Sequence, residues 1–270
     1  MAYRILVINP GSTSTKVAVY DDESVVFERT LRHSMADLAG YPRVGDQRRF
    51  RCDAVQGCLK EQGVTTDSLS AVVGRGGILR PLASGTYRVN GAMLADLTDP
   101  ATLEHASNLG APLADEIAAS VGVPAFIVDP VAVDEFDDVA RLTGLPELER
   151  RSLSHALNVK AVARRAARDL GARYEDLNLV VVHLGSGISV TAHRRGRMVD
   201  VNNATDAGPF SPERAGTLPL AAFVDLCYSG RYTAEAMKRL IVHEAGLAAY
   251  FGTRETQDVE RLITAGDAKA

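Results

Sequence analysis

The stretch NPGSTSTK, residues 9–16, combines the residue types that bind phosphate in proteins: a glycine, a run of hydroxyls and a lysine. It lacks the second glycine of the G-x-x-x-x-G-K-[ST] loop, and the residues that follow are typical of a strand rather than a helix. A glycine-rich turn between two antiparallel strands can still point backbone N–H groups at an anion. The alternative is an ordinary hairpin turn. The expected phosphate contacts come from Asn9, Gly11, Ser12, Ser14 and Lys16.

A second glycine turn lies in VVVHLGSGISVTAHRRGRMVDV, residues 180–201. The order is the same: a β-branched run, a Gly/Ser turn, an alternating run, a polar turn and a third run. Gly11 and Gly185 are as far apart in the chain as Val25 and Val199, so the register holds across both turns. This pattern indicates that one strand–turn–strand–turn–strand unit is duplicated. The predicted second phosphate turn comprises Gly185, Ser186 and Gly187.

Charged residues in loop-like positions are the next candidates. Arg75 lies among glycines after a buried run, where a ligand can approach the backbone and a guanidinium can bind a carboxylate or phosphate bidentately. Asp129 ends the run FIVD, and ligands of open α/β sheets gather at the carboxyl ends of strands. Arg214 lies in a long segment rich in Asn, Gly and Pro, and could close on a substrate anion. The alternatives are a surface turn for Arg75 and a capping or turn role for Asp129. For Arg80, a ligand-binding role and a surface position are equally open.

Two histidines stand close to these segments. His155 is expected in the first turn of a helix, where a capping or packed histidine is the simpler interpretation. His183 lies in the strand directly before the second glycine turn, so it either borders the phosphate turn or fills core space.

Alternating strand and helix patterns predict an α/β fold with a mixed sheet. Asp99–Pro100 is expected to begin a helix, because an aspartate cap followed by proline is a common helix start. Ser152 or Ser154 is expected to cap the helix that ends at Gly171. Outside the two duplicated units, strands are expected at 70–74 and 124–129, and helices at 46–63, 99–121, 152–171, 219–228, 233–245 and 255–265.

Two domains are expected, at residues 1–150 and 151–270. The second half has no counterpart of the strands that follow the first duplicated unit, so by its own symmetry the chain looks incomplete. An unfinished sheet would leave an edge of unpaired backbone groups and an uncovered apolar face.

The composition is 46% hydrophobic and 24% charged, with a net charge of -4. This mild acidity gives no support for a nucleic-acid partner, and no apolar run approaches the roughly 20 residues that a membrane-spanning helix needs. The three cysteines form no C-x-x-C pair, which favours free thiols in a reducing compartment, with the cytoplasm as the expected location.

The motifs in chain order resemble those of the butyrate kinase family, relatives of acetate kinase in the superfamily that also holds sugar kinases, Hsp70 and actin. The resembling segments are INPGSTSTK at 8–16, VVGRGGILRP at 72–81, HASNLGA at 105–111, VDP at 128–130, RRSLSHALN at 150–158, HLGSGISV at 183–190 and VDVNNATDAGPFSPERAGTLP at 199–219. The last segment is highly specific, although its NNATDAGPF part is one residue shorter than the usual family form.

The resemblance implies a duplicated, actin-like (ribonuclease H-like) fold with the active site between its two domains. It implies reversible transfer of the γ-phosphoryl group of ATP, with Mg²⁺, to butyrate or a similar short-chain carboxylate. A homo-oligomer is also expected, with no nucleic-acid or membrane partner. Asn9 matches an asparagine near the phosphates, Asp129 a catalytic or metal-coordinating aspartate and His155 a histidine that steadies the phosphoryl group. Arg75 lies in the segment that supplies a substrate arginine, Arg214 matches the second active-site arginine, and His183 precedes the second phosphate turn.

Other functions remain open at this point: a kinase for acetate, propionate or a branched-chain acid, an actin- or Hsp70-like nucleotide switch, or a non-catalytic fragment. The resemblance also implies that the family continues beyond residue 270, with a Gly-Gly adenosine motif and a metal-linked glutamate in that part. Residues 1–270 alone are therefore expected not to support efficient ATP turnover.

Overall fold

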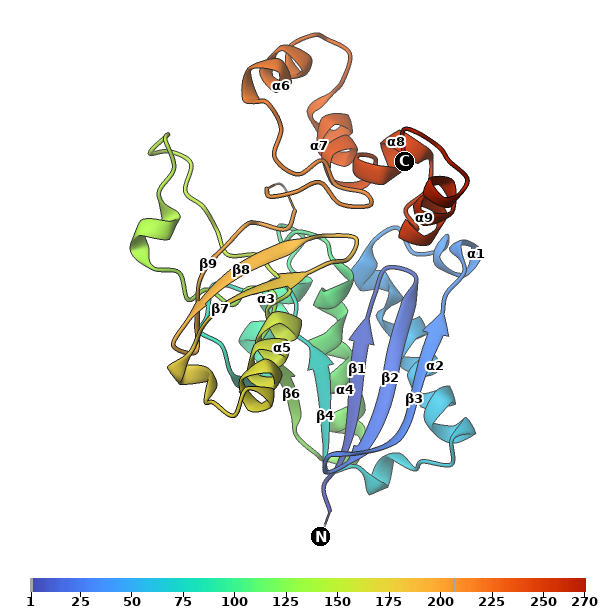
Figure 1. Ribbon diagram of the computed structural model, residues 1–270. Coiled ribbons are helices and arrows are strands. Elements are labelled where there is room, and N and C mark those ends of the chain that lie inside the picture. Colours follow the sequence, from blue (N-terminus) through green and yellow to red (C-terminus); the bar gives the residue numbers. More distant parts are fainter. Residues whose placement is uncertain (1, 206) are drawn as a thin grey trace. The chain divides into compact units, whose positions relative to one another are not determined.

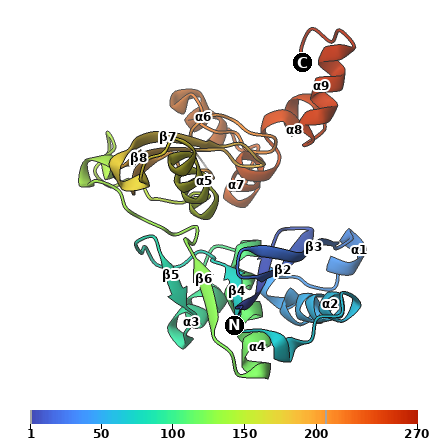
Figure 2. The ribbon, with the colours of Figure 1, turned by 60° about the horizontal axis from the view of Figure 1, so that its bottom comes forward.

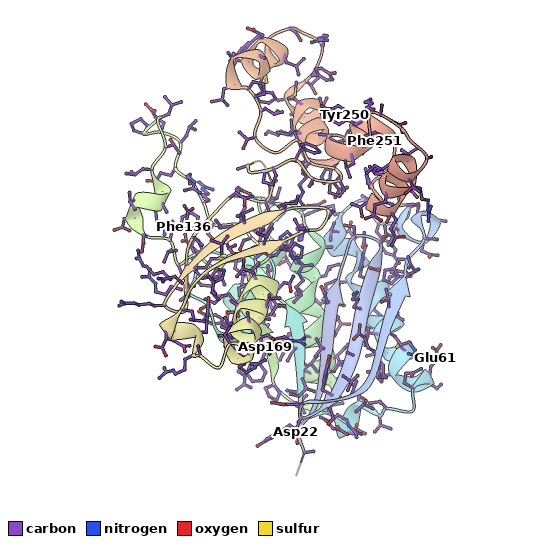
Figure 3. All side chains as sticks on the ribbon, in the orientation of Figure 1. Asp22, Glu61, Phe136, Asp169, Tyr250 and Phe251 are labelled. Atoms are coloured by element: carbon purple, nitrogen blue, oxygen red, sulfur yellow. The ribbon has the colours of Figure 1, made fainter. Side chains whose placement is uncertain are left out.

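The computed structural model describes residues 2–205 and 207–270, which form two compact units, Met1–Val133 and Asp134–Ala270. The division falls before the boundary at residue 150 that the sequence suggested. The reason is that residues 134–150 bond to the second unit, where Lys160 Nζ meets Glu135 Oε2 at 2.6 Å and Arg150 Nη2 meets Asp200 Oδ1 at 2.7 Å. Phe136, labelled in Figure 3, lies in this segment, with the Arg150 guanidinium 5.6 Å from its ring centre.

A six-stranded mixed sheet forms the centre of the first unit, in the order β3-β2-β1-β4-β6-β5 (Figure 1). β1, β4 and β6 run parallel, and the other pairs are antiparallel. The mixed sheet and its first five expected strands are confirmed, whereas the short edge strand β5 was not expected. The strands are β1 (Arg4–Pro10), β2 (Ser14–Asp21), β3 (Ser24–Arg32), β4 (Ala71–Arg75), β5 (Thr86–Arg88) and β6 (Ala125–Val128).

The hairpin of β2 and β3 closes through Asp22, whose φ of 51° lies in the left-handed region that Asp tolerates better than most residues (Figure 3). In β1, buried side chains alternate with half-buried ones, and Leu6 and Ile8 fill the core. The first residues of β2 alternate in the same way, with Val17 buried and Lys16 exposed.

Helices α2 (Arg48–Glu61) and α4 (Gly110–Val121) lie against the sheet of the first unit (Figure 2). Their buried residues include Val55 and Ile117, which join the strand residues in one core cluster. The remaining α-helices of this unit are the short α1 (Met35–Leu38) and α3 (Gly91–Thr98).

The expected helix at 99–121 is wrong in its first part. α3, which the sequence did not predict, ends at Thr98, and a 3-10 turn at Ala106–Leu109 precedes α4. Asp99 adopts φ −60° and ψ 127° because a residue before proline is restricted to extended conformations. Its Oδ1 accepts the N–H of Ala101, so this aspartate caps a turn after a helix.

A three-stranded antiparallel sheet in the second unit repeats the first three strands of the chain, as the duplication predicted. Its strands are β7 (Asn178–His183), β8 (Ser189–Arg194) and β9 (Arg197–Val201), and α5 (Ala156–Asp169) packs against β7. Ala163, Ala167 and Tyr174 form a small core with the α5-facing side chains of β7. On the opposite face Val180 is 72% and Val182 49% exposed, so the expected uncovered apolar face is present.

Helices make up the regular structure after the second sheet: α6 (Leu220–Cys227), α7 (Ala234–His243), α8 (Gly246–Phe251) and α9 (Thr256–Thr264). The three expected helices are confirmed, and α8, which carries Tyr250 and Phe251 (Figure 3), was not expected. Within residues 202–205 and 207–270 no strand follows β9. In the described chain, no helix is long and apolar enough to cross a membrane.

Candidate active site

The first phosphate turn is the connection between β1 and β2. Gly11 N donates to Ser14 O at 2.8 Å, while Gly11 O is taken by the buried Arg51, so the turn is held from inside the unit. Asn9 and Lys16 are directly opposite each other in the ladder, and their side chains therefore share one face. Lys16 is exposed and has no ion-pair partner among the described residues, so its ammonium group is not occupied by a carboxylate of the protein.

Arg75 ends β4, which runs parallel to β1 with Gly74 beside Ile8. Its Nη1 lies 3.5 Å from Asn9 Oδ1, so the structure brings these two expected site residues together. Burial lowers the pKa of the Arg75 guanidinium below its ordinary value, yet arginine stays protonated in proteins. Arg75 is thus a half-buried cation beside the first phosphate turn.

The glycines around Arg75 have a different purpose from the one inferred from the sequence. A Cβ at Gly74 would lie 2.0 Å from Gly110 O, and a Cβ at Gly76 would lie 2.4 Å from Pro130 Cβ. These glycines let the protein's own backbone approach β4. This close packing explains the glycines, so they are no evidence that a ligand approaches the backbone here.

Asp129 follows β6 at the same sheet edge as Asn9 and Arg75. β1, β4 and β6 are neighbouring parallel strands, so their carboxyl ends meet there. Asp129 is 1% exposed and has a φ of 38°, and strained conformations of this kind cluster at functional sites. Its Oδ1 accepts the N–H of Gly85 at 2.8 Å, so it also stabilises a turn.

In the second unit the rings of His155 and His183 stack, with centres 3.8 Å apart and planes 10° from parallel. His155 occupies the N-cap position of α5, one residue before the first turn in which it was expected. The backbone N–H of His155 reaches Ser189 Oγ at 3.4 Å, and the same hydroxyl lies 2.9 Å from His155 Nδ1. Ser189 thus contacts both the backbone and the ring of His155 and fixes the orientation of the imidazole, whose Nε2 edge is not engaged by this hydroxyl.

Asn158 lies next to this pair, with Nδ2 2.6 Å from His183 Nδ1. His183 therefore faces α5, and a Cβ at Gly185 would lie 2.9 Å from its Nε2, so the half-buried ring lies beside the second turn. Ser152 and Ser154 are both buried, and neither caps α5. The expected serine cap is wrong because His155 takes the N-cap position.

The second glycine turn connects β7 and β8, and Arg214 lies directly against it. A Cβ at Gly187 would be 2.3 Å from Arg214 Nη1. Ser211 links the two segments, since its Oγ donates to Ser186 O and accepts from Arg214 N at 3.2 Å. The structure thus brings together the second turn and the long loop at 199–219, of which residue 206 lies outside the described residues.

The Arg214 guanidinium retains an unused donor. Nη1 donates to Ala204 O, but Nε is buried without a partner among the described residues. Burial lowers the pKa of Arg214 below its ordinary value, while Glu213 partly opposes this. A buried N–H without an acceptor costs free energy, and an anionic ligand would remove that cost.

A cavity of about 550 Å³ adjoins the second turn on the side of α8 and α9. This volume is typical of small-molecule pockets, as is a mixed apolar and polar lining. Its walls include Leu184, Ser186, Phe210, Leu247 and Thr256.

Arg80 is not part of this arrangement. Its side chain is 85% exposed and pairs with Asp96 at 3.0 Å, so the structure favours the surface alternative.

No group of three potential metal-ligating side chains occurs among residues 2–205 and 207–270. Mg²⁺ that is bound together with phosphates usually takes only one or two protein carboxylates and keeps several waters. Asp129 alone therefore fits a magnesium ion that a nucleotide brings with it.

Sequence reasoning missed Arg51, Asn158, Ser189 and Ser211. Arg51 looked like an ordinary polar residue of an amphipathic helix. Asn158 could have been found, because it lies three residues after His155 and such pairs share a helix face.

Comparisons with known proteins give the family of the chain. A model described as the acetokinase family matches residues 147–270. Butyrate kinase 1 of Clostridium acetobutylicum is 50% identical over 268 residues, which cover 99% of this chain and 76% of that protein. A probable butyrate kinase of Clostridium botulinum is 51% identical over the same shares.

Solved structures with the same fold include acetate kinase from Porphyromonas gingivalis, with a TM-score of 0.77 at 18% identity over 99% of this chain and 74% of that chain. A propionate kinase from Francisella tularensis gives a TM-score of 0.76 at 18% identity, over 99% of this chain and 75% of that chain. The fold is therefore the α/β, actin-like ATPase fold of the acetate kinase structures. The chain belongs to the acetokinase family, and membership of this family of kinases implies the use of ATP.

Proposed function

We propose that this chain transfers the γ-phosphoryl group of ATP to butyrate or a similar short-chain carboxylate, giving an acyl phosphate and ADP in a reversible reaction. The observation that carries the proposal is the 50% identity to Butyrate kinase 1 over 99% of the chain. The geometry of each unit supports it, because cations, histidines and an aspartate lie beside the two glycine turns.

The reaction forms a bond between a carboxylate oxygen and the γ-phosphorus and breaks the bond from that phosphorus to the oxygen that leaves with ADP. A carboxylate is already an anionic nucleophile, so no general base is needed. The difficulty is the like charge of the two reactants and the charge that spreads over the equatorial phosphoryl oxygens in a loose transition state. Catalysis is then positioning and neutralisation.

Arg75 and Arg214 are the groups proposed to neutralise the charge of the reactants. The buried Nε–H of Arg214, which has no acceptor among the described residues, would donate to an anionic oxygen. His155 would donate from Nε2 to an equatorial oxygen, since Ser189 orients the ring through Nδ1. His183 would support that ring by stacking. Mg²⁺ bound with the nucleotide neutralises phosphate charge, and Asp129 is the residue proposed to hold it.

The proposed phosphate contacts come from the two turns. In the first turn they are Asn9, Gly11, Ser12, Ser14 and Lys16, and in the second Gly185, Ser186 and Gly187. We further propose that the cavity beside the second turn takes part of the nucleoside, because it directly adjoins Ser186 and has an apolar wall that includes Phe210. The proposal also includes a homo-oligomer and a cytoplasmic location, the latter supported by the free thiols of Cys52, Cys58 and Cys227.

The test is acyl phosphate formation from ATP, Mg²⁺ and a panel of acids, trapped with hydroxylamine. We expect product that depends on the acid, formed at the low rate expected of residues 1–270 alone, with butyrate at least equal to acetate, propionate and isobutyrate. One methylene changes binding by only about 1–3 kcal/mol, so competition between acids in one reaction is the sensitive form of the assay. ATP hydrolysis without any acid-dependent product would overturn the proposal in favour of a nucleotide switch.

A further inference from the structure

Arg51 of α2 is 0% exposed and points at the first phosphate turn from inside the unit. Its Nη1 donates to Gly11 O at 2.8 Å and to Ser14 O at 2.9 Å, and its Nη2 donates to Ser12 O at 2.9 Å. One guanidinium therefore holds the carbonyls of three of the four residues 11–14. An ordinary hairpin turn satisfies its carbonyls from the opposite strand or from water.

These inward carbonyls determine where the amides point. In a trans peptide the C=O and the next N–H lie on opposite sides of the bond. With the carbonyls of Gly11 and Ser12 directed at Arg51, the N–H groups of Ser12 and Thr13 are directed away from it. Adjacent outward amides of this kind form an anion-binding concavity.

The charge of Arg51 is not neutralised locally. Among the described residues it has no carboxylate partner, and its other contacts are Gln47 Oε1 and Thr15 Oγ1. Lys160, the other fully buried cation in the part of the chain described, is paired with Glu135 at 2.6 Å. A buried charge without a counter-charge is costly, and an anion bound at the turn would offset that cost.

The partners of Arg51 keep its fork in one orientation. Gln47 Oε1 accepts from both Nε and Nη2, at 3.0 and 2.8 Å. Thr15 Oγ1 accepts from Nη1 at 3.0 Å and lies 2.9 Å from His33 Nε2. Burial, and after it the charge of Arg51, lowers the pKa of His33 below its ordinary value, while Asp37 partly opposes this.

We propose that Arg51 is the positioning residue of the first phosphate turn: by binding the carbonyls of Gly11, Ser12 and Ser14 it turns the amides of Ser12 and Thr13 toward the nucleotide's phosphates. The inference rests on the proposed function only in taking the phosphates to be those of ATP. Arg51 does not touch the nucleotide, and its side chain acts through the backbone.

The test uses Arg51→Lys, which keeps the buried charge but loses the fork that reaches three carbonyls. The probe is inorganic tripolyphosphate, measured by titration calorimetry on the folded protein. We expect the dissociation constant to rise about tenfold, and the KM for ATP to rise by a similar factor while the KM for butyrate stays within about twofold. A merely structural role would not separate the two KM values.

Val55→Ala is the matched control. Val55 is 0% exposed on the same helix and contributes to the core without a hydrogen bond to the turn. It should lower stability and leave tripolyphosphate binding unchanged. Equal binding by Arg51→Lys and the parent chain would overturn the proposal, as would a parent chain that binds no tripolyphosphate.

Should Arg51→Lys not fold, Thr15→Val removes one acceptor of the guanidinium at almost constant shape. It should weaken tripolyphosphate binding several-fold, and unchanged binding would count against the proposal in the same way. The two hypotheses fail separately. Weakened tripolyphosphate binding together with no acyl phosphate from the parent chain would retain the role of Arg51 and reject the proposed reaction.

Discussion

Gly187→Ala tests whether Arg214 acts from its place against the second glycine turn, without changing any charge. A Cβ at residue 187 would lie 2.3 Å from Arg214 Nη1 and 2.8 Å from its Cζ, where ordinary contacts begin at 3.4 Å. The guanidinium must therefore retreat by about 1 Å, and a displacement of about 1 Å at a group that contacts reacting atoms costs on the order of 10²-fold in rate. The backbone is not strained, because φ at residue 187 is not in the left-handed region.

The assay is hydroxamate trapping with ATP and butyrate, and each variant is compared with the parent chain. Gly144→Ala is the control, since a Cβ there meets nothing within 4 Å and φ is likewise not positive. It should keep the parent's turnover, whereas Gly187→Ala should lose about 10²-fold, or about 2.7 kcal/mol of transition-state stabilisation.

Arg214→Ala alone should cost on the order of 10²–10³ in turnover. Adding Gly187→Ala to it should cost little more, because the clash partner is gone and the two changes share one cause. Fully additive losses, or a Gly187→Ala variant as active as Gly144→Ala, would refute the assigned role of Arg214.

The other predictions concern single residues of both units. Arg75→Ala should lower turnover on the order of 10²-fold in the trapping assay with an unchanged circular dichroism spectrum, and near-parental turnover would remove it from the mechanism. Lys16→Ala should raise the KM for ATP more than the KM for butyrate, and equal effects would contradict its place in the phosphate turn. Burial lowers the pKa of His193 to about 4, so the protein should lose up to about 3 kcal/mol of unfolding free energy as the pH falls from about 6.5 to 4, because the unfolded state takes up the proton first. Urea titrations across that range should show this slope, and His193→Gln should make it shallower. Burial raises the pKa of the Cys52 thiol to about 11, so iodoacetamide at pH 8 should label the partly exposed Cys227 first, and the reverse order in peptide mapping would be evidence against the packing around α2.

The duplicated strand units could be predicted because strand periodicity and glycine turns are local signals. The two turns appeared as the two places where a β-branched run meets a Gly/Ser cluster, and both connect the expected strands. β5 could not be found, because Thr86–Arg88 is too short for a period-two pattern. Asp99–Pro100 misled because the same dipeptide suits a helix start and the turn after a helix.

The rule that ligands gather at the carboxyl ends of strands singled out Asp129, and the structure places Arg75 at the end of the neighbouring parallel strand β4. What local patterns could not supply is the support of these groups. Arg51 lies 40 residues after Gly11 in the chain, far beyond the window in which periodicity is informative. Ser189 reaches His155 from a separation of 34, and no periodicity carries such information.

The central claim, that a carboxylate oxygen takes the γ-phosphoryl group, is tested most directly with butyrate carrying ¹⁸O in both carboxylate oxygens. The measurement is the ³¹P spectrum of the acyl phosphate formed from unlabelled ATP and Mg²⁺. Because the carboxylate oxygen attacks phosphorus, the bridging oxygen of the product should be ¹⁸O, and the phosphorus signal should show the corresponding isotope shift. Unshifted acyl phosphate, or unlabelled inorganic phosphate as the sole product, would contradict the account.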